Sequence, residues 1–465
     1  NPWQDDYSAL SSMDNYHLWG TYNVHDPSCC KLGDYYYMYS TDAILGENRK
    51  EAEEKNVPLG FIQVRRSKDL VKWEFIGWAF PEIPHEAVEW VRSHADGKGA
   101  TNIWAPYIIP FGDKYRLYYC VSAFGLKTSY IGLAESASPE GPWMQRGCVV
   151  KTDATSVMNA IDPSIIADSA TGKWWMHYGS FFGGLYCVEL NPETGLPVQE
   201  GDQGHLIARR ATYWKDNLEA PEIIYNPELK QYYLFVSYDP LMTTYNVRVG
   251  RSDKAEGPFV DYFGVELKNT TNNFPILTAP YRFNNHPGWA GTAHCAVFTS
   301  DEGQYFMAHQ GRLSPHNQMM DLHLRQVFFT SDGWPVVSPE RYTGSASRKF
   351  SAADIVGEWE IIRVQEPAYE RQLQAGQILW GEGQLKNEEW NVSCTLSLKK
   401  DGQLDENKGY WKFAERGQLL SLTLNGESVD NLLVFAGHDW ENETETVLFT
   451  GLDSRGRSVW GKRTK

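Results

Sequence analysis

The strongest constraint on the fold is a pattern of segments that occurs five times along the chain. Five runs are rich in aromatic and other β-forming residues and end in small or polar residues, as is typical of a buried strand that enters a turn. In chain order they are YYYMYSTD from Tyr35, YRLYYCVS from Tyr115, WWMHYGSF from Trp174, YYLFVSYD from Tyr232 and YFMAHQG from Tyr305. The recurrence of this run at intervals of several tens of residues indicates one supersecondary unit that is repeated along the chain.

Each aromatic run lies between other predicted strands. The preceding segments are HDPS, IWAPYI, IDPSII, EAPEII and GTAHCAVF, and the following ones are GFIQVRRS, YIGLAESA, LYCVELN, VRVGRSD and LHLRQVFFTSDG. In several units a Gly-Pro turn and an aromatic residue lead to a fourth strand, as in EGPWMQRG and EGPFVDYFG. Four antiparallel strands repeated radially predict an all-β fold, a five-bladed β-propeller over residues 1–348. A β-sandwich of many hairpins is the alternative, but it does not explain why one segment order recurs.

Two insertions and a separate C-terminal region complete the predicted organisation. The insertions are LGENRKEAEEKNVP and PEIPHEAVEWVRSHADGKG, the second with a predicted short helix. Their charges indicate a solvated surface, and the walling of a groove is the alternative. From about Ser351 the chain changes to short alternating strands, among them GEWEII, QILWGEGQL, GYWKFAE and SVWGKR. We therefore predict a smaller all-β domain, a barrel or sandwich, over residues 349–465, with a packing or substrate-holding role.

Charge and composition exclude several classes of function. A formal net charge of −16 without a strongly basic tract argues against nucleic-acid binding. No apolar run is long enough to span a membrane, so we expect no transmembrane segment. The seven cysteines show no metal-type spacing. The opening NPWQDDYS does not resemble a signal peptide, and we expect a secreted, periplasmic or cell-surface monomer whose export signal has been removed.

The segments before the aromatic runs supply the candidate site residues Asp26, Trp104, Asp162, Glu219 and His294. The innermost strands of a propeller surround its axis, so one position per blade points into a shared funnel. Proline follows Asp26 and Asp162, and we expect it to hold each aspartate in extended geometry where a strand ends or kinks. Asp-Pro is also a common turn, but its repetition in register favours convergence on one site. Crowded carboxylates favour protonation of one member, an arrangement that acid–base hydrolysis uses.

At these residues the sequence resembles the family 43 glycoside hydrolases, and within them the α-1,5-arabinanases with a C-terminal β-barrel domain. The stretches that carry the resemblance are HDPS, WAP, NAIDPSIIAD with HYGSFFGGLYCVEL, and LEAPEIIY with YYLFVSYD. The resemblance implies that Asp26 is the general base, that Glu219 is the general acid, and that Asp162 tunes the pKa of the acid and orients it. We then expect hydrolysis with inversion, which places the two carboxyl groups roughly 6.5–9.5 Å apart.

Each of four further residues has an expected role and an alternative to it. Trp104 is expected to form a platform under a furanose ring, with core packing as the alternative. Ser180 is a candidate hydrogen-bonding contact to a sugar hydroxyl, or it only closes a turn. His294 falls where related arabinanases place a histidine beside a calcium ion, but TAHCAV departs from the usual Gly-His-Asn-Ser, and a buried, hydrogen-bonded histidine is the alternative. Glu222 competes with Glu219 as the acid, although an odd offset on a strand points it to the opposite face.

The expected function is endo-type cleavage of α-1,5-L-arabinofuranosyl linkages in plant cell-wall arabinan or arabino-oligosaccharides. Ca²⁺ is the expected metal, and no organic cofactor is expected. Two alternatives stay open. One is an exo-acting α-L-arabinofuranosidase or β-xylosidase of the same family, and the other is a non-catalytic carbohydrate-binding propeller whose acids only hold a sugar or an ion.

Overall fold

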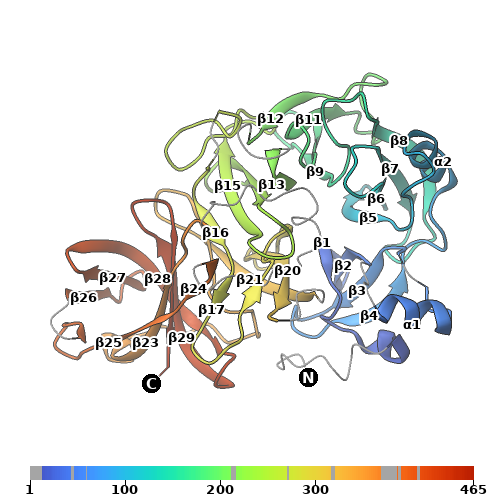
Figure 1. Ribbon diagram of the computed structural model, residues 1–465. Coiled ribbons are helices and arrows are strands. Elements are labelled where there is room, and N and C mark those ends of the chain that lie inside the picture. Colours follow the sequence, from blue (N-terminus) through green and yellow to red (C-terminus); the bar gives the residue numbers. More distant parts are fainter. Residues whose placement is uncertain are drawn as a thin grey trace.

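A computed structural model describes residues 13–464 except for 43–46, 59, 211–215, 270–271, 316–319, 368–384, 386–388 and 406–408. Nearly all regular structure in the described residues is β-strand. The repeat units surround a common centre on the right of Figure 1, and the C-terminal strands form a separate body on the left. The expectation of an all-β propeller followed by a smaller β-domain is therefore confirmed.

The first four repeat units form four separate antiparallel sheets of four strands each. The first comprises β1 (His25–Leu32), β2 (Tyr35–Thr41), β3 (Gln63–Ser67) and β4 (Glu74–Trp78). The second comprises β5 (Trp104–Phe111), β6 (Lys114–Ser122), β7 (Ser129–Ser136) and β8 (Met144–Thr152). The third comprises β9 (Ser164–Ala167), β10 (Trp174–Tyr178), β11 (Leu185–Leu190) and β12 (His205–Ala208). The fourth comprises β13 (Leu218–Asn226), β14 (Gln231–Tyr238), β15 (Asn246–Ser252) and β16 (Ile276–Thr278).

In every one of these sheets the predicted aromatic run is the second strand, because its β-branched and aromatic side chains pack on both faces between neighbouring units. One strand prediction was wrong. In the fourth unit the fourth strand is β16 and not the EGPFVDYFG segment, where Val260 makes only single bridges to Arg251 and Glu266.

The last repeat unit is not a separate four-stranded sheet. Its strands β19 (Cys295–Thr299), β20 (Tyr305–Leu313), β21 (Asp321–Phe329) and β22 (Pro335–Val337) pair in chain order. The far end of β20 extends beyond β19 and pairs with β18 (Trp289–Ala290). Through β17 (Tyr281–Arg282) and β24 (Asn391–Val392) the unit becomes part of a seven-stranded sheet. The structure thus has four separate blades, where the sequence predicted five.

The residues that precede the prolines are left-handed rather than extended. The φ angles are 46° at Asp26, 37° at Ala105, 59° at Asp162 and 55° at Ala220. His294, at the same place in the last unit, has φ 52° although no proline follows it. The predicted extended geometry was therefore wrong. In the first, second and fourth units the strand register shifts at this point, which marks a β-bulge, and a left-handed residue there re-aims the side chain. The predicted kink is present in every unit as a left-handed residue.

A second position, directly after each proline, ties one unit to the next by a hydrogen bond. The bonds are Ile108 N–H to Ser28 Oγ (3.1 Å), Tyr107 Oη–H to Ile165 O (2.8 Å), Ile223 N–H to Ser164 Oγ (3.0 Å) and Val297 N–H to Glu222 Oε1 (2.9 Å). These four contacts are between-unit contacts of the innermost strands. They satisfy buried polar groups where two sheets meet.

The N-terminal segment joins the first unit to the last. Tyr22 and Asp321 form a β-bridge, and the backbone N–H groups of Asn23 and Leu322 donate to Met320 O and Thr21 O at 2.8 and 2.9 Å. The described chain ahead of β1 holds the short 3₁₀-helix η1 (Met13–Leu18). This pairing closes the ring of units with main-chain hydrogen bonds.

Helices occur in both insertions. The predicted helix of the second insertion is α2 (His85–His94), which packs Ala87 and Val91 into the core of the first two sheets. The first insertion holds α1 (Glu47–Lys55). Within the described residues, no helix has the length and apolar character that a membrane span requires.

The C-terminal domain is one antiparallel seven-stranded sheet that curves around its own core. After α3 (Ala352–Ile355) its strands are β23 (Gly357–Arg363), β25 (Cys394–Leu398), β26 (Gly409–Ala414), β27 (Leu419–Leu424), β28 (Glu427–Asp439), β29 (Thr444–Leu452) and β30 (Ser458–Arg463). Single bridges Leu398–Leu404 and Gln403–Tyr410 bring the edge strands β25 and β26 towards each other. Most of the predicted strand QILWGEGQL, residues 377–385, lies outside the described residues.

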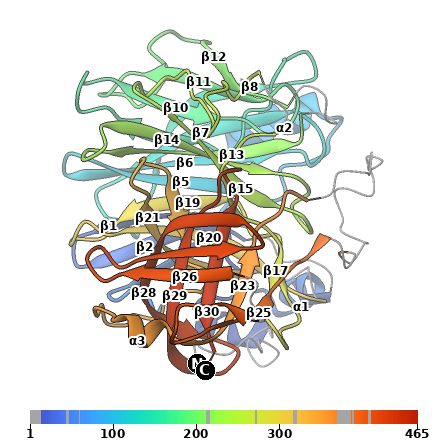
Figure 2. The same cartoon turned by 90° about the vertical axis from the view of Figure 1, so that its left-hand side faces the viewer.

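The C-terminal domain packs directly against the propeller, in front of it in Figure 2. Ile362, Val364 and Trp460 belong to the same buried cluster as Tyr281 and Trp289 of the last unit. The strand β24, which comes from the C-terminal part of the chain, pairs in parallel with β17. The two parts therefore share a hydrophobic core as well as a sheet.

Candidate active site

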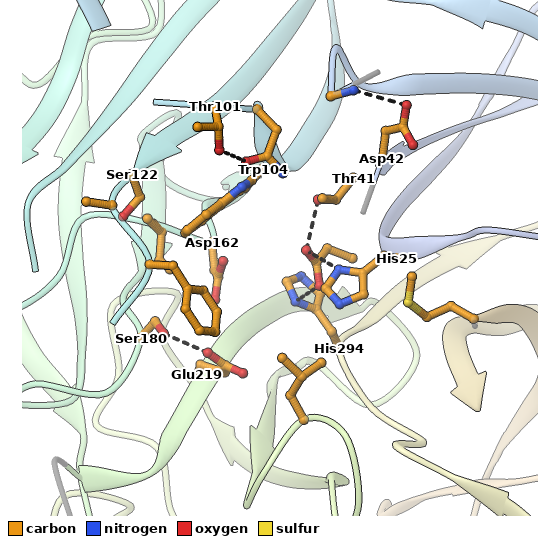
Figure 3. A pocket seen from close by; sticks show the side chains of 18 of the residues that line it. His25, Thr41, Asp42, Thr101, Trp104, Ser122, Asp162, Ser180, Glu219 and His294 are labelled. Carbon is orange, nitrogen blue, oxygen red and sulfur yellow. Dashed lines mark hydrogen bonds and ion pairs between the residues drawn. The ribbon is translucent and has the colours of Figure 1, made fainter. Parts of the chain in front are cut away.

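A cavity of about 790 Å³ lies among the first strands of the units, and all six site residues predicted from the sequence line it. They are Asp26, Trp104, Asp162, Ser180, Glu219 and His294. In the view of Figure 3, Asp162, Ser180 and Glu219 lie on one side of the cavity, and His25, Thr41 and His294 lie on the other. The ring of units thus brings together residues that are far apart in the sequence.

Asp26 is held by three side chains. Thr41 Oγ1 donates to its Oδ2 at 2.8 Å, His25 Nδ1 lies 2.7 Å from the same oxygen, and His294 Nδ1 lies 2.9 Å from Oδ1. Burial by itself would raise the pKa of Asp26, but the two neighbouring histidines hold that pKa well below its usual range. Asp26 is therefore an ionised carboxylate that can accept a proton.

His294 is the matching cation. Burial lowers its pKa, but the negative charges of Asp26, Asp162 and Glu219 outweigh burial and raise it to about 9. Burial lowers the pKa of His25, the other histidine at Asp26. At neutral pH the pair therefore consists of an ionised Asp26 and a protonated His294.

The other two carboxyl groups behave in the opposite way. Burial raises the pKa of Asp162 well above its usual range, although His294 opposes the shift, and the charges of Glu219 and Asp26 add to it. Burial likewise raises the pKa of Glu219, against two hydrogen bonds from Ser180 and Tyr245 that favour the charged form. Asp162 Oδ2 also accepts the backbone N–H of Ala220, next to Glu219, at 3.2 Å. One cavity thus combines a carboxylate whose pKa is lowered with two carboxyl groups whose pKa is raised.

Glu222, the competing acid, does not line the cavity. Its Oε2 accepts from Ser164 Oγ at 2.7 Å and its Oε1 accepts from Val297 N–H, so it lies between three units. A bulge in the pairing of β13 separates it from Glu219. The two glutamates lie at different places, but the parity argument assumed a regular strand, and the bulge between the two residues removes that regular alternation.

Trp104 and Ser180 both reach the cavity. Trp104 is half-buried and makes an edge contact with Phe124 at a centroid separation of 6.2 Å. Ser180 donates to Glu219 Oε2 at 2.7 Å. A platform role for Trp104 and a sugar contact for Ser180 stay predictions, but the serine also has a partner within the protein.

The residues around His294 do not fit a calcium ion held by protein ligands. Calcium prefers six to eight oxygen ligands, and His294 Nδ1 is already engaged with the Asp26 carboxylate. Among the described residues, three clustered metal-ligand side chains occur only at Glu340, Asp439 and Glu441. That cluster surrounds the ammonium group of Lys462. Calcium at His294 stays a prediction of the resemblance.

Several cavity residues were not found from the sequence. His25 lies beside Asp26 in HDPS, so its position in the motif was a usable signal, whereas nothing local marks Tyr245. The first insertion lines the cavity with Glu53, Asn56 and Val57. This insertion therefore walls the cavity, which was the alternative to a purely solvated surface.

Comparison with known proteins identifies the family. Residues 20–335 match the family model of glycosyl hydrolases family 43. The chain belongs to this family. Residues 339–461 match the C-terminal lipocalin-like domain of family 43 proteins, so both parts of this family 43 chain are accounted for.

The similar family 43 proteins include arabinan-degrading enzymes. The extracellular endo-α-(1→5)-L-arabinanase of Thermotoga petrophila is 29% identical over 95% of this chain and 94% of that protein. The extracellular exo-α-(1→5)-L-arabinofuranosidase of Cellvibrio japonicus is 30% identical over 70% of this chain and 90% of that protein. The crystal structure of the endo-1,5-α-L-arabinanase from Thermotoga petrophila RKU-1 has a TM-score of 0.78 and 28% identity, over 96% of this chain and 99% of that chain.

Proposed function

We propose that this family 43 protein cleaves α-1,5-L-arabinofuranosyl linkages within arabinan. The observation that carries the proposal is the contrast between two carboxyl groups in one cavity: Asp26 has a lowered pKa and Glu219 a raised one. A base that is ionised and an acid that is protonated at the same pH are what glycoside hydrolysis requires. Two relatives that each cover 95% of this chain are named endo-arabinanases, which favours the endo mode.

In the proposed reaction Asp26 takes a proton from a water molecule, whose oxygen attacks the anomeric carbon. Glu219 gives its proton to the departing glycosidic oxygen as the bond to the anomeric carbon breaks. Asp162 Oδ2 accepts the backbone N–H of Ala220, next to Glu219, and through this contact Asp162 would orient the acid and tune its pKa, as the resemblance implies. Direct attack by water inverts the configuration at the anomeric carbon. Trp104 would support the furanose ring.

Finer features of the molecule belong to the same proposal. We count β19–β22 as a fifth blade for two reasons. His294 repeats the left-handed kink, and Val297 N–H donates to Glu222 Oε1 of the fourth unit, like the hydrogen bonds between the other units. We assign residues 1–348 to the catalytic propeller and 349–465 to the accessory domain. The names of the similar proteins support an extracellular location, and we propose a monomer.

The first test is the hydrolysis of linear arabinan by the wild-type protein and two variants. We expect Asp26→Ala and Glu219→Gln each to lower kcat by at least about 10²-fold, since general acid–base catalysis contributes 10²–10⁴-fold. A ladder of oligosaccharides from the wild type, with the inverted β-anomer as the first product in proton NMR, is the expected pattern. Full activity of either variant would contradict the assignment of roles.

The same assay separates the alternatives. Release of monosaccharide alone would favour the exo-acting arabinofuranosidase, and turnover of xylo-oligosaccharides would favour a β-xylosidase. Binding of arabinan or xylan without turnover would favour a carbohydrate-binding propeller. Metal analysis of the purified protein and of His294→Ala tests the calcium that the resemblance implies. One equivalent in the wild type that is lost in the variant would support this ion, and no metal in either protein would agree with the poor fit of the side chains around His294.

A further inference from the structure

Both oxygens of the Glu219 carboxyl group accept a hydrogen bond from a hydroxyl group. Tyr245 Oη donates to Oε1 at 2.7 Å and Ser180 Oγ donates to Oε2 at 2.7 Å. Ser180 follows β10 in the third unit, and Tyr245 directly precedes β15 in the fourth. Figure 3 shows the contact between Ser180 and Glu219 at the cavity wall. The carboxyl group is thus held from two different elements.

The two donors are themselves fixed. Tyr245 is 1% exposed, and its backbone N–H donates to Pro240 O at 3.1 Å. Its carbonyl accepts from Thr292 Oγ1, in the segment that leads to His294. Ser180 forms a β-bridge with Glu219. The backbone positions of both donors are therefore set by neighbouring segments.

The geometry of a carboxyl group explains why two such donors matter. Each oxygen has two lone-pair directions, and one direction on each is occupied by a hydroxyl group. Rotation about the last carbon–carbon bond of Glu219 would break both hydrogen bonds. The acidic proton can then lie only along one of the two remaining directions, and the carboxylate left after proton transfer stays solvated by both hydroxyl groups. Burial, with the nearby negative charge of Glu219, raises the pKa of Tyr245 well above its usual range, so the phenol keeps its proton.

We infer that Tyr245 is a positioning residue for catalysis, which together with Ser180 orients the Glu219 carboxyl group towards the leaving-group oxygen. The inference rests on the acid role proposed for Glu219. Tyr245 acts through Glu219 and takes no part in proton transfer. Its loss should therefore affect the step that needs a protonated leaving group and leave substrate binding nearly unchanged.

The test is Tyr245→Phe, assayed on linear arabinan as a function of pH. We expect kcat to fall about 10-fold to 10²-fold, within the range of general acid catalysis. KM should change by less than about threefold, because the hydrogen bond that is lost acts on proton transfer in the transition state and not on substrate binding. The hydrogen bond from Tyr245 lowers the pKa of Glu219, so its removal should raise that pKa. Activity falls as Glu219 loses its proton, and the alkaline limb of the kcat profile should therefore move to higher pH.

A second substrate separates positioning from loss of structure. On an aryl arabinofuranoside with an activated leaving group, protonation of the leaving oxygen is not needed, and Tyr245→Phe should retain most of the wild-type rate. An unshifted alkaline limb, or equal losses on arabinan and the aryl substrate, would overturn the inference. If the wild type does not cleave the aryl substrate, the shift of the alkaline limb on arabinan is the test of the inference.

Two further variants complete the design. Tyr118→Phe removes another buried tyrosine hydroxyl, which donates to Gly195 O at 3.0 Å and does not line the cavity, and should leave kcat and the pH profile unchanged. Ser180→Ala removes the other donor and should shift the alkaline limb in the same direction, which tests the inference if Tyr245→Phe fails to fold. Failure of the proposed function itself looks different, because Glu219→Gln would then retain its activity on arabinan.

Discussion

Glu219 and Glu222 show how the surroundings of a residue decide its role. Both are glutamates on β13, and burial raises the pKa of both. Glu219 meets two hydroxyl groups at the cavity, whereas Glu222 accepts from a backbone N–H and from Ser164 between units. The first arrangement leaves a proton available to a ligand in the cavity. The second uses the carboxyl group only to satisfy buried neighbours.

Glu222 should make the stability of the protein depend on pH. Burial raises its pKa to about 7, so the folded protein binds a proton that the unfolded chain releases near pH 4.5. The stabilising contribution of protonated Glu222 is fully present below the pKa of a glutamate in the unfolded chain. This contribution is lost as the pH rises through the folded-state pKa of about 7. Glu222→Gln should therefore raise the free energy of unfolding at pH 8 by up to about 3 kcal/mol and change it little at pH 4.

Urea unfolding of the two proteins at both pH values measures this difference. Arabinan hydrolysis by the same variant gives the control for its role, because a residue outside the cavity should leave kcat close to that of the wild type. A loss of activity comparable to that of Glu219→Gln would instead make Glu222 the acid.

The first strand of each unit has two structural features. One is a left-handed kink at the cavity, and the other is a hydrogen bond to the next unit. The kink costs about 1–2 kcal/mol at a residue other than glycine. It persists at Asp26, Asp162 and His294 because neighbouring units hold the strand on both sides. Strain of this kind often collects at functional sites, where it aims side chains.

Loss of one hydrogen bond between units should lower the stability of the protein measurably. Ser164→Ala removes the acceptor of the Ile223 N–H group and the donor to Glu222. Because the N–H is then buried without that partner, we expect the free energy of unfolding to fall by about 1–3 kcal/mol. Ser93→Ala, on the exposed face of α2, should change it by less than about 0.5 kcal/mol. Equal effects of the two substitutions in urea unfolding would show that the contact contributes nothing.

The two domains are joined by a buried ion cluster as well as by apolar packing. Lys462 of β30 is fully buried, and its Nζ lies 2.9 Å from Glu340 Oε1 and 3.0 Å from Asp439 Oδ1, with Glu441 as a third partner. Glu340 follows β22 of the propeller, whereas Asp439 ends β28 of the C-terminal domain. One ammonium group therefore neutralises a carboxylate that follows β22 and two carboxylates at the end of β28.

Removal of this charge should destabilise the whole chain. Lys462→Met leaves two buried carboxyl groups, Glu340 and Asp439, and the half-buried Glu441 without their cation, at a cost of about 3–5 kcal/mol near pH 7. The cost should become smaller as the pH falls, because the carboxyl groups then take up protons and lose their mutual repulsion. Thermal unfolding of Lys462→Met at pH 5 and pH 7 checks the direction. Lys412→Met, at an exposed position on β26, serves as the matched control and should unfold like the wild type at both pH values.

Local sequence was enough to predict the first three strands of each unit and six of the residues that line the cavity. An alternating or fully apolar β-segment is defined by its own side chains, and its repetition places equivalent positions at one axis. For that reason Asp26, Asp162 and Glu219 were found from the spacing of their segments, and all three line the cavity. The kind of backbone geometry at these positions was not predictable, because a bulge depends on the strand that pairs beside it.

Other features arise only when distant segments meet. The far end of β20 pairs with β18 because the chain returns there from the fourth unit. Tyr245 reaches Glu219, and Lys462 reaches Glu340, across long separations in sequence that no local pattern records. The opposite pKa shifts of Asp26 and Glu219 have the same origin. Residue types and their spacing specify the strands, but burial and charge at a site are sums over neighbours that only the folded chain brings together.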